Sequence, residues 1–510
     1  MRQAHEVAKV RAAERALMAK LGPDELMRRA AFGLASVCAR LLDGAYGAQV
    51  VVLAGSGDNG GDALYAGALL ARRGATVRAI AAGSRIHQGG AAALKEAGGR
   101  LHPHDDQAVP ALIEDADLII DGMLGIGGRG GLREPYLDLA VQAADSPGLI
   151  VAVDLPSGID ADTGELAGPA VRADVTVTFG TWKPGLLVDP AASLAGLTEL
   201  VDIGLGPELA APDLVALQSA DVAALLPEPG AESDKYRRGV LGVVAGSELF
   251  TGAAWLATGA AIRGGAGMVR LVSAAHAAEV VRNHWPEAVI TVAGPDDDPG
   301  EVLKAAGRVQ AWTAGPGMGT DEKSATLLAA VLASDLPALV DADGLTLVAR
   351  DRSLLDRAAP TLLTPHAGEL ARLLGADRDD VEARRLEHVQ RAADELGATV
   401  LLKGSTTVIA EPGNTAPVWV NPTGTAWLAT AGSGDVLSGL GGALLAQGLG
   451  PADAAAVAAY LHGLAGRLAA GGGDDAGYVP GVAAPIGAAD VLHALPAAVR
   501  AVQEADGGLE

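Results

Sequence analysis

The chain has 510 residues, a hydrophobic fraction of 49%, only 3% aromatic residues and a formal net charge of −24. This length exceeds what one hydrophobic core supports, so we expect at least two domains. The acidic balance disfavours binding to nucleic-acid phosphate or to acidic lipid, because no dense run of Lys and Arg offsets it. No apolar stretch is long enough for a membrane span or typical of a signal peptide, and the single cysteine, Cys38, excludes an intrachain disulfide. We therefore expect a cytoplasmic protein that binds neither nucleic acid nor membrane.

Short apolar runs separated by glycine-rich turns fill the first half of the chain. Residues 50–54 are typical of a strand, and a glycine-rich loop, an amphipathic helix and a second strand at 76–81 follow. Further strands are predicted at 118–120, 149–153 and 175–178, each followed by a Gly- or Pro-rich turn. This order predicts a parallel sheet with ligand sites at the carboxyl ends of its strands.

The periodic pattern thins out between Gly204 and Gly239, where four prolines fall, and we place a domain boundary near residue 215. A second series of strands is predicted at 240–245, 268–272, 309–313, 338–341, 361–363 and 399–402, with long helices at 435–447 and 451–470. The expected fold class is α/β: a Rossmann-like three-layer sandwich over 1–215 and a second α/β domain over 216–510. The tail from Gly471 is expected to be loose.

The segment Gly55-Ser-Gly57-Asp-Asn-Gly60-Gly61-Asp62 lies between the first strand and its helix and has the spacing GxGxxG. Ordinary dinucleotide-binding turns of this kind have an acidic residue roughly 20 positions later, which binds the ribose hydroxyls. Residues 75–87 contain no Asp or Glu, which argues against a standard dehydrogenase. The start of the helix, expected at Asp62, remains suited to a phosphate or a ribose.

Three strand ends place oxygen-bearing side chains at one edge of the expected sheet. Asn59 lies in the glycine-rich loop, Asp121 follows 118–120, and Asp154 and Ser157 follow 149–153. Amide, carboxylate and hydroxyl oxygens suit a hard cation, and the absence of His and Cys argues against zinc. Each Asp alone is explained equally well as the cap of a helix or turn. The combination of three strand ends favours a site.

These segments, together with Phe179-Gly-Thr-Trp-Lys-Pro-Gly185, resemble the NAD(P)H-hydrate epimerase domain. The resemblance implies that Asn59, Asp121 and Ser157 hold a potassium ion and that Asp154 contacts the altered ring as an acid/base. It also implies that the hydrated cofactor is lined by Asp58, Asn59, Gly60, Gly61 and Asp62 and by Gly125, Ile126, Gly127, Gly128, Arg129, Gly130 and Gly131. The family usually reads Asn-Asn-Gly-Gly-Asp-Gly, whereas this chain has Asp58 first and Ala63 last.

The clearest motif of the second half is Thr430-Ala-Gly-Ser-Gly-Asp435-Val-Leu-Ser-Gly439. Glycines before a helix expose consecutive N–H groups at its positive end, where a transferring phosphoryl group can bind. An Asp at that point can deprotonate an attacking hydroxyl. A glycine-rich turn with Asp435 as its N-cap explains the same residues. No GxxxxGK[ST] segment occurs, which excludes a P-loop enzyme.

Neighbouring strand ends favour the catalytic interpretation. Lys403-Gly-Ser-Thr-Thr407 supplies a cation and hydroxyls for a nucleotide phosphate, although a surface lysine beside a turn has the same sequence. Gly315-Pro-Gly-Met-Gly319 permits close backbone approach, or is only a tight connection. His366 follows a strand beside Pro and Gly, where a ligand contact is favoured over a structural role.

With Asp341-Ala-Asp-Gly-Leu345 and Asn421-Pro-Thr-Gly424, these segments resemble the NAD(P)H-hydrate dehydratase domain, which has a ribokinase-like fold, from about Asp234 to His462. By this resemblance, Asp435 activates the ring hydroxyl of the S-hydrate for attack on the terminal phosphate of ADP, with Mg²⁺ bridging the phosphates. Loss of that phosphate regenerates the dihydropyridine. The resemblance implies nucleotide contacts at Lys403, Gly404, Ser405, Thr406, Thr407 and Gly434, and substrate contacts at Ala253, Gly317, His366 and Asp435.

Hydration of the nicotinamide ring produces two epimers, and the phosphorylating domain accepts only one, which explains the fusion. We therefore expect a bifunctional enzyme, an epimerase joined to an ADP-dependent dehydratase, that acts as a homo-oligomer. Two alternatives remain. One is a ribokinase-like kinase of a sugar, hydroxymethylpyrimidine or nucleoside. The other is a non-catalytic first domain of the kind found in a eukaryotic RNA-decapping scaffold, although Asn59, Asp121, Asp154 and Ser157 favour catalysis.

Overall fold

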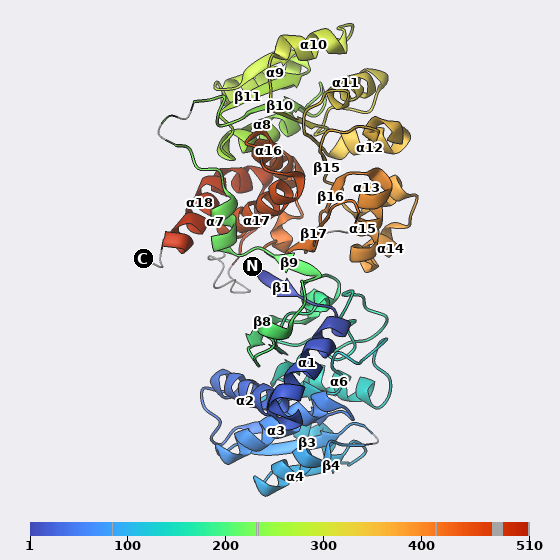
Figure 1. Ribbon diagram of the computed structural model, residues 1–510, viewed down its shortest axis with the longest axis vertical. Coiled ribbons are helices and arrows are strands. Elements are labelled where there is room, and N and C mark those ends of the chain that lie inside the picture. Colours follow the sequence, from blue (N-terminus) through green and yellow to red (C-terminus); the bar gives the residue numbers. More distant parts are fainter. Residues whose placement is uncertain (84, 231, 233, 414–415, 472–482, 508–510) are drawn as a thin grey trace. The chain divides into compact units, whose positions relative to one another are not determined.

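The computed structural model describes residues 1–83, 85–230, 232, 234–413, 416–471 and 483–507. It divides into two compact units, Gln3–Leu214 and Val215–Glu510, the latter with Met1–Arg2. Each unit contains one sheet whose strands alternate with helices along the chain (Figure 1). The expected α/β class is therefore confirmed. Within the described residues, no helix is long and apolar enough to cross a membrane.

The N-terminal unit contains a seven-stranded sheet. Its strands are β2 (Gln49–Ala54), β3 (Thr76–Ala81), β4 (Arg100–Pro103), β5 (Leu118–Gly122), β6 (Leu149–Val153), β7 (Val175–Phe179) and β8 (Leu197–Val201). Its helices are α1 (Val7–Leu21), α2 (Pro23–Leu41), α3 (Asp58–Arg72), α4 (Gln88–Glu96), α5 (Val109–Glu114) and α6 (Tyr136–Asp145). The strand order is β4-β3-β2-β5-β6-β7-β8, and every neighbouring pair is parallel.

Both faces of the central strands of this sheet are buried, which explains why these strands are continuous apolar runs. Val50 and Val52 point into a core that they share with residues of α2 and α3, which lie side by side in Figure 1. The alternate residues, Val51 and Leu53, point into a second core shared with α5 and α6. Side chains along a strand alternate between faces, so the central strands contribute to both cores and the unit is a three-layer sandwich.

Helix α3 begins at Asp58, four residues before the expected start at Asp62. Gly60 and Gly61 therefore lie inside its first turn and are buried. A Cβ atom at Gly60 would lie 2.3 Å from the carbonyl oxygen of Gly55. Only glycine can come this close to the Gly55 carbonyl. The last glycines of the motif therefore belong to the first turn of α3 and not to a separate loop.

The C-terminal unit has a larger sheet, with the strand order β1-β9-β18-β17-β16-β15-β14-β13-β10-β11-β12. The strands are β1 (Arg2–Ala4), β9 (Leu214–Ala216), β10 (Val240–Val244), β11 (Met268–Ser273), β12 (Val289–Val292), β13 (Ala311–Ala314), β14 (Ala338–Val340), β15 (Thr361–Leu363), β16 (Thr399–Leu402), β17 (Thr407–Ala410) and β18 (Val418–Asn421). Strands β10 to β16 pair in parallel, whereas β17 pairs antiparallel with β16 and β18.

The helices of this unit cover the sheet and its ends. They are α7 (Ser219–Leu225), α8 (Thr251–Arg263), α9 (Ala275–His284), α10 (Pro299–Ala306), α11 (Glu322–Leu332), α12 (Ala342–Arg350), α13 (Ala367–Leu374), α14 (Arg378–Ala383), α15 (Arg385–Leu396), α16 (Ser433–Ala446), α17 (Pro451–Ala469) and α18 (Ala488–Gly507). Helices α16 and α17 match the expected long helices to within two residues at each end.

The expectation of a loose tail from Gly471 is wrong for the last helix. Residues 472–482 lie outside the described residues, but α18 is regular and Val491, Leu492 and Leu495 are fully buried. These apolar residues recur at helical spacing and pack in the same core as α8 and α17. Helix α18 is therefore part of the C-terminal core.

Close packing of α16 on α8 makes a prediction about Gly439. A Cβ atom there would lie 2.1 Å from the carbonyl oxygen of Ala257. We expect Gly439→Ala to destabilise the C-terminal unit by about 1–3 kcal/mol through overpacking, which outweighs a helix-propensity gain of up to about 1 kcal/mol. The matched change Gly252→Ala, in α8 with nothing within 4 Å of the added carbon, should leave stability unchanged or slightly raised. Calorimetric unfolding measures both, and an equal rise in Tm for the two variants would contradict the packing.

Two candidate active sites

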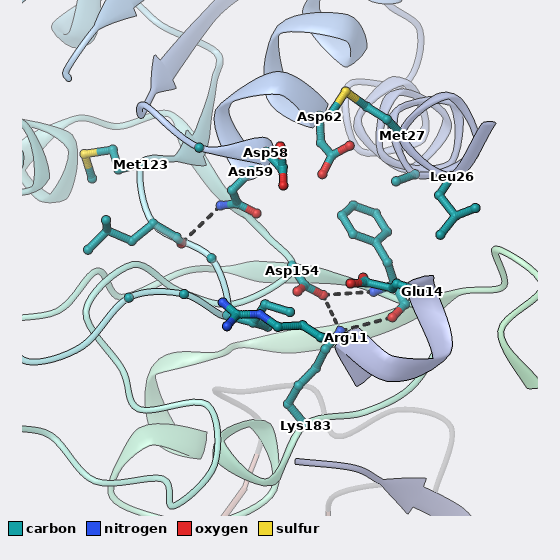
Figure 2. A pocket seen from close by; sticks show the side chains of 18 of the residues that line it. Arg11, Glu14, Leu26, Met27, Asp58, Asn59, Asp62, Met123, Asp154 and Lys183 are labelled. Atoms are coloured by element: carbon teal, nitrogen blue, oxygen red, sulfur yellow. Dashed lines mark hydrogen bonds and ion pairs between the residues drawn. The ribbon is translucent and has the colours of Figure 1, made fainter. Parts of the chain in front are cut away.

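A cavity of about 540 Å³ opens where the strands of the N-terminal sheet end, at the edge where the sequence predicted a site (Figure 2). The predicted residues that line it are Asp58, Asn59, Asp62, Gly125, Ile126, Gly127, Gly128 and Asp154. Gly60 and Gly61 are buried in the first turn of α3 instead, and residues 129–131 continue the loop beyond the lining. The remaining walls come from α1, α2, Met123, Phe179 and Lys183.

Asp154 occupies a left-handed backbone conformation with φ 64°, which is unusual for a residue other than glycine. Its Oδ1 accepts hydrogen bonds from the Thr178 hydroxyl at 3.0 Å, from the Phe179 N–H at 3.1 Å and from the ammonium of Lys183. Lys183 is 1% exposed and also donates to the Phe179 carbonyl at 3.0 Å. The buried Asp154–Lys183 pair is thus held rigidly at the cavity wall.

Asn59, Asp121 and Ser157 meet around the backbone of Leu124. Ser157 donates from its hydroxyl to Asp121 Oδ1 at 2.6 Å and from its N–H to Asp121 Oδ2 at 2.8 Å. The Asn59 amide donates to the Leu124 carbonyl at 3.1 Å, and the Leu124 N–H donates to Ser157 Oγ at 2.8 Å. The three predicted ligands are therefore neighbours.

Asp121 is fully buried, and burial raises the pKa of its carboxyl to about 6 although Ser157 donates to it. Within the described residues, no cationic side chain pairs with it. A buried carboxylate surrounded by amide, carbonyl and hydroxyl oxygens is a donor set that fits a hard monovalent cation. The residues present therefore fit potassium.

In the C-terminal unit, Asp435 lies in the first turn of α16. Burial, and next the Asp341 carboxylate, raise the pKa of Asp435 to about 7. Lys403 Nζ lies 2.7 Å from Asp341 Oδ1 and 3.7 Å from Glu369 Oε2. Burial lowers the pKa of Lys403, but the Asp341 and Glu369 carboxylates outweigh it and the net pKa is raised. The Ser438 hydroxyl donates to Asp341 Oδ2 at 2.6 Å.

Arg385 holds the predicted nucleotide-contact loop, residues 403–407, in place through hydrogen bonds to its backbone. This buried guanidinium donates to the carbonyls of Lys403 at 3.0 Å and Thr406 at 3.1 Å. A Cβ atom at Gly404 would lie 2.2 Å from Arg385 Nη2, so a larger residue there would displace the guanidinium from these carbonyls. Gly434 adjoins the same group, because a Cβ atom on it would lie 3.5 Å from Lys403 Nζ.

The predicted substrate contacts fall into two sets. Gly317 has φ 59°, and a Cβ atom on it would lie 2.8 Å from the Cβ of Ala253, so these two residues adjoin. His366 is the N-cap of α13: its Nδ1 accepts from the Gly368 N–H at 3.0 Å and from the Glu369 N–H at 3.3 Å. His366 therefore caps a helix through Nδ1, and its side chain is 60% exposed.

Comparison with known proteins matches both units. The family described as YjeF-related protein N-terminus matches residues 23–185, and the NAD(P)H-hydrate dehydratase family matches residues 241–477. The bifunctional NAD(P)H-hydrate repair enzyme Nnr of Mycobacterium tuberculosis (strain CDC 1551 / Oshkosh) is 51% identical over 464 residues, which cover 89% of this chain and 92% of the relative. Its counterpart from Mycobacterium leprae (strain TN) is 49% identical over 92% of this chain and 94% of its own length.

The chain belongs to the bifunctional NAD(P)H-hydrate repair enzymes.

Among solved structures, the ADP/ATP-dependent NAD(P)H-hydrate dehydratase of Bacillus subtilis, co-crystallised with ATP/Mg²⁺, is 28% identical. It aligns with 56% of this chain and 98% of its own length at a TM-score of 0.47. Family membership confirms the predicted function, an epimerase fused to a dehydratase. It favours that function over the alternatives of a small-molecule kinase and a non-catalytic first domain.

Several residues of the repair enzyme's sites escaped sequence reasoning. Lys183 and Asp341 lie in the motifs that carried the resemblance, but nothing in their spacing indicated which carboxylate or ammonium each would meet. Arg385 and Glu14 lie outside every motif. Glu14 had one signal, because it is a charged residue beside the buried positions Val10, Ala13 and Leu17 of α1.

The Lys403–Asp341 pair generates a stability prediction. Lys403→Met should destabilise the C-terminal unit by about 3–5 kcal/mol, because it leaves a carboxylate that is 2% exposed without its cation. Adding Asp341→Asn to that variant should recover most of the loss. Lys304→Met, which breaks an exposed pair with Glu301, is the matched control and should cost less than about 1 kcal/mol. Denaturant unfolding measures all three, and equal losses for Lys403→Met and the control would refute the role of the pair.

Proposed function

We propose that residues 1–215 carry the epimerase activity of this repair enzyme and residues 216–510 its dehydratase activity. The family matches fall inside these two ranges. The two candidate sites also fall inside them, one at the ends of β2, β5 and β6 and the other at the start of α16. The chemistry below follows from this division.

In the dehydratase, Asp435 removes the proton from the ring hydroxyl of the S-hydrate. The freed oxygen attacks the terminal phosphorus of ADP, and AMP leaves. The phosphate ester then breaks at its carbon–oxygen bond, a neighbouring ring proton departs, and the dihydropyridine is restored. A base with a pKa near neutrality suits the first step, because it is available in ionised form and still takes a proton readily.

Lys403 faces Asp435 and Gly434, beside the N–H groups at the start of α16. We assign residues 403–407 and Gly434 to the nucleotide, and Ala253, Gly317, His366 and Asp435 to the substrate. Asp341 and Glu369 neutralise the Lys403 ammonium. When ADP binds, the Lys403 ammonium would interact with both the ADP phosphate and these carboxylates. The Mg²⁺ that accompanies ADP would offset the negative charge that the phosphates add.

In the epimerase, Asn59, Asp121 and Ser157 would hold potassium, and Asp154 is the acid/base at the altered ring. Such a cation would compensate the buried charge of Asp121. The hydrogen bonds of Asn59 and Ser157 with Leu124 fix the turn that continues into the cavity-lining residues 125–128. We further propose that the protein works in the cytoplasm as a homo-oligomer and binds neither nucleic acid nor membrane, in keeping with a net charge of −24.

The observation that carries the proposal is the raised pKa of Asp435 beside the Lys403 ammonium at a helix N-terminus. The deciding experiment supplies the purified protein with both hydrate epimers, ADP, Mg²⁺ and K⁺, and follows recovery of reduced-nicotinamide absorbance. Complete recovery requires both activities. Recovery that stops once the S-hydrate is consumed, with the R-hydrate converted to the S-hydrate no faster than in buffer, would contradict the epimerase assignment.

Asp435 predicts a pH dependence for the dehydratase. Because the base must be ionised, kcat/KM for the S-hydrate should rise about tenfold per pH unit below about 7 and level off above it. Asp435→Asn should abolish nucleotide-dependent recovery but leave epimerisation intact. The reciprocal control, Asp154→Asn, should abolish epimerisation and leave dehydration of the S-hydrate. If kcat/KM for the S-hydrate does not change over about three pH units centred on about 7, Asp435 is not the base.

The buried carboxyl of Asp121 leads to a prediction about potassium. We expect epimerisation to need K⁺ and the protein to bind K⁺ more weakly in acid. Since a cation requires the ionised carboxylate, the K⁺ concentration for half-maximal rate should increase as pH falls below about 6. Asp121→Asn should remove the dependence on K⁺ and most of the rate. Asp115→Asn makes the same chemical change at an exposed residue and should behave as wild type. Retention of K⁺ dependence in Asp121→Asn would place the ion elsewhere.

A further inference from the structure

Helix α1 brings a carboxyl group, Glu14, into the N-terminal cavity from outside every motif. The matched family segment begins at residue 23, so it does not include this helix. Glu14 lies beside the buried residues Val10, Ala13 and Leu17, and it lines the cavity together with Arg11. Figure 2 shows Glu14 and Arg11 entering the cavity that Asp154 and Lys183 line from the strand ends.

Glu14 has no hydrogen bond and no ion pair to any described residue. Burial, followed by the Asp154 charge, raises the pKa of Glu14 above its ordinary value, and Asp58 acts in the same direction. Lys183 and Arg11 oppose the shift without reversing it. Asp62 adds to this environment: one of its carboxyl oxygens is buried without a partner in the described structure, and burial raises its pKa well above the usual range.

Asp154 and Glu14 therefore differ in the cation available to each. Asp154 Oδ1 accepts three hydrogen bonds, one from an ammonium, whereas its Oδ2 has no partner among the described residues. Glu14 has no such partner. Two carboxyl groups in one cavity, one supported as an anion and one not, are suited to act as a base and an acid in the same reaction.

The chemistry of the substrate class needs such a pair. Water adds to an enamine at the carbon beside nitrogen, so the hydroxyl of the hydrate sits on a carbinolamine carbon. One route that inverts that carbon breaks the carbon–oxygen bond on one face of the ring and forms it again on the other. A ring bound between α1 and the strand ends presents one face to each wall.

We propose that Glu14 is a catalytic residue of the epimerase, which gives a proton to the departing hydroxyl on one face, while Asp154 takes a proton from the water that adds to the other face. This inference rests on the proposed epimerase function of the N-terminal unit. In the step, the ring nitrogen lone pair forms a C=N⁺ bond as the hydroxyl leaves as water. A second water then attacks the opposite face, and the π electrons of the C=N⁺ bond return to nitrogen. The attacking water gives its proton to Asp154. Exchange with solvent resets both carboxyls, and in the reverse direction their roles are exchanged.

The test uses the full-length protein with the pure R-hydrate and no nucleotide, and follows formation of the S-hydrate by chromatography above the spontaneous rate. Glu14→Gln should lower kcat at least about 100-fold and change KM by less than about threefold, because it removes the proton but keeps the shape. Glu14→Asp should recover part of the rate. The matched control is Glu25→Gln on α2, which pairs with Arg29 outside the cavity lining and should behave as wild type.

Two measurements on the wild-type protein do not depend on how the variants fold. The epimerisation rate should fall as pH rises through the raised pKa of Glu14, because only the protonated acid donates. In ¹⁸O-labelled water, each inversion should introduce one labelled oxygen. Inversion without label, or a rate with no alkaline fall, overturns the proposed step.

The outcomes also separate this inference from the proposed function. If the wild-type protein does not accelerate epimerisation, the function itself fails. If the wild type accelerates it, Asp154→Asn abolishes it and Glu14→Gln, with wild-type thermal stability, retains it, then only the role of Glu14 fails. A loss of rate in Glu14→Gln that appears entirely in KM would make Glu14 a substrate-binding residue and would also overturn the proposal.

Discussion

Burial of both faces of the central strands in each sheet is the constraint on which the rest of this structure depends. A parallel strand covered by helices on two sides has no exposed face, so its polar chemistry is confined to the strand ends. Both candidate sites are found there: Asp121 and Asp154 end strands of the first sheet, and Asp341 and Lys403 end strands of the second. The low aromatic content is consistent with this design, because Ala, Val and Leu fill flat layers between strands and helices closely.

Each unit contains a buried carboxylate–lysine pair, but the two pairs serve different chemistry. In the N-terminal unit, the proposed acid/base Asp154 is itself the residue that pairs with the lysine, Lys183. In the C-terminal unit, the lysine pairs with Asp341 instead. Burial, and next the Asp341 carboxylate, raise the pKa of Asp435 to about 7. Because a buried ion pair contributes little net stability compared with apolar packing, these pairs are best understood through what they do to neighbouring groups.

Negative charge is concentrated at the N-terminal site, where Asp58, Asp62, Asp154 and Glu14 share one cavity. Mutual repulsion and burial favour protonation of some of these carboxyls, and the proposed cation at Asp121 offsets charge in the adjoining turn. An acidic protein can therefore bind an anionic dinucleotide, since the backbone N–H groups of α3 and of residues 125–128 supply positive potential locally.

The sequence by itself determined the α/β class, the central strands of both sheets and the motifs that identify the family, because hydrophobic periodicity and short glycine-rich spacings are local properties of the chain. It did not predict outer strands such as β4 and β8, which are less apolar. Only the tertiary structure decided which side chains meet. It placed Lys183 on Asp154, Arg385 beneath the loop at residues 403–407, His366 in a helix cap and Glu14 in the cavity wall. It also placed α18 in the core, where sequence reasoning expected a loose tail. Apart from the His366 cap, whose partners are two and three residues away, these contacts join segments that are far apart along the chain, and local periodicity does not specify which segments meet.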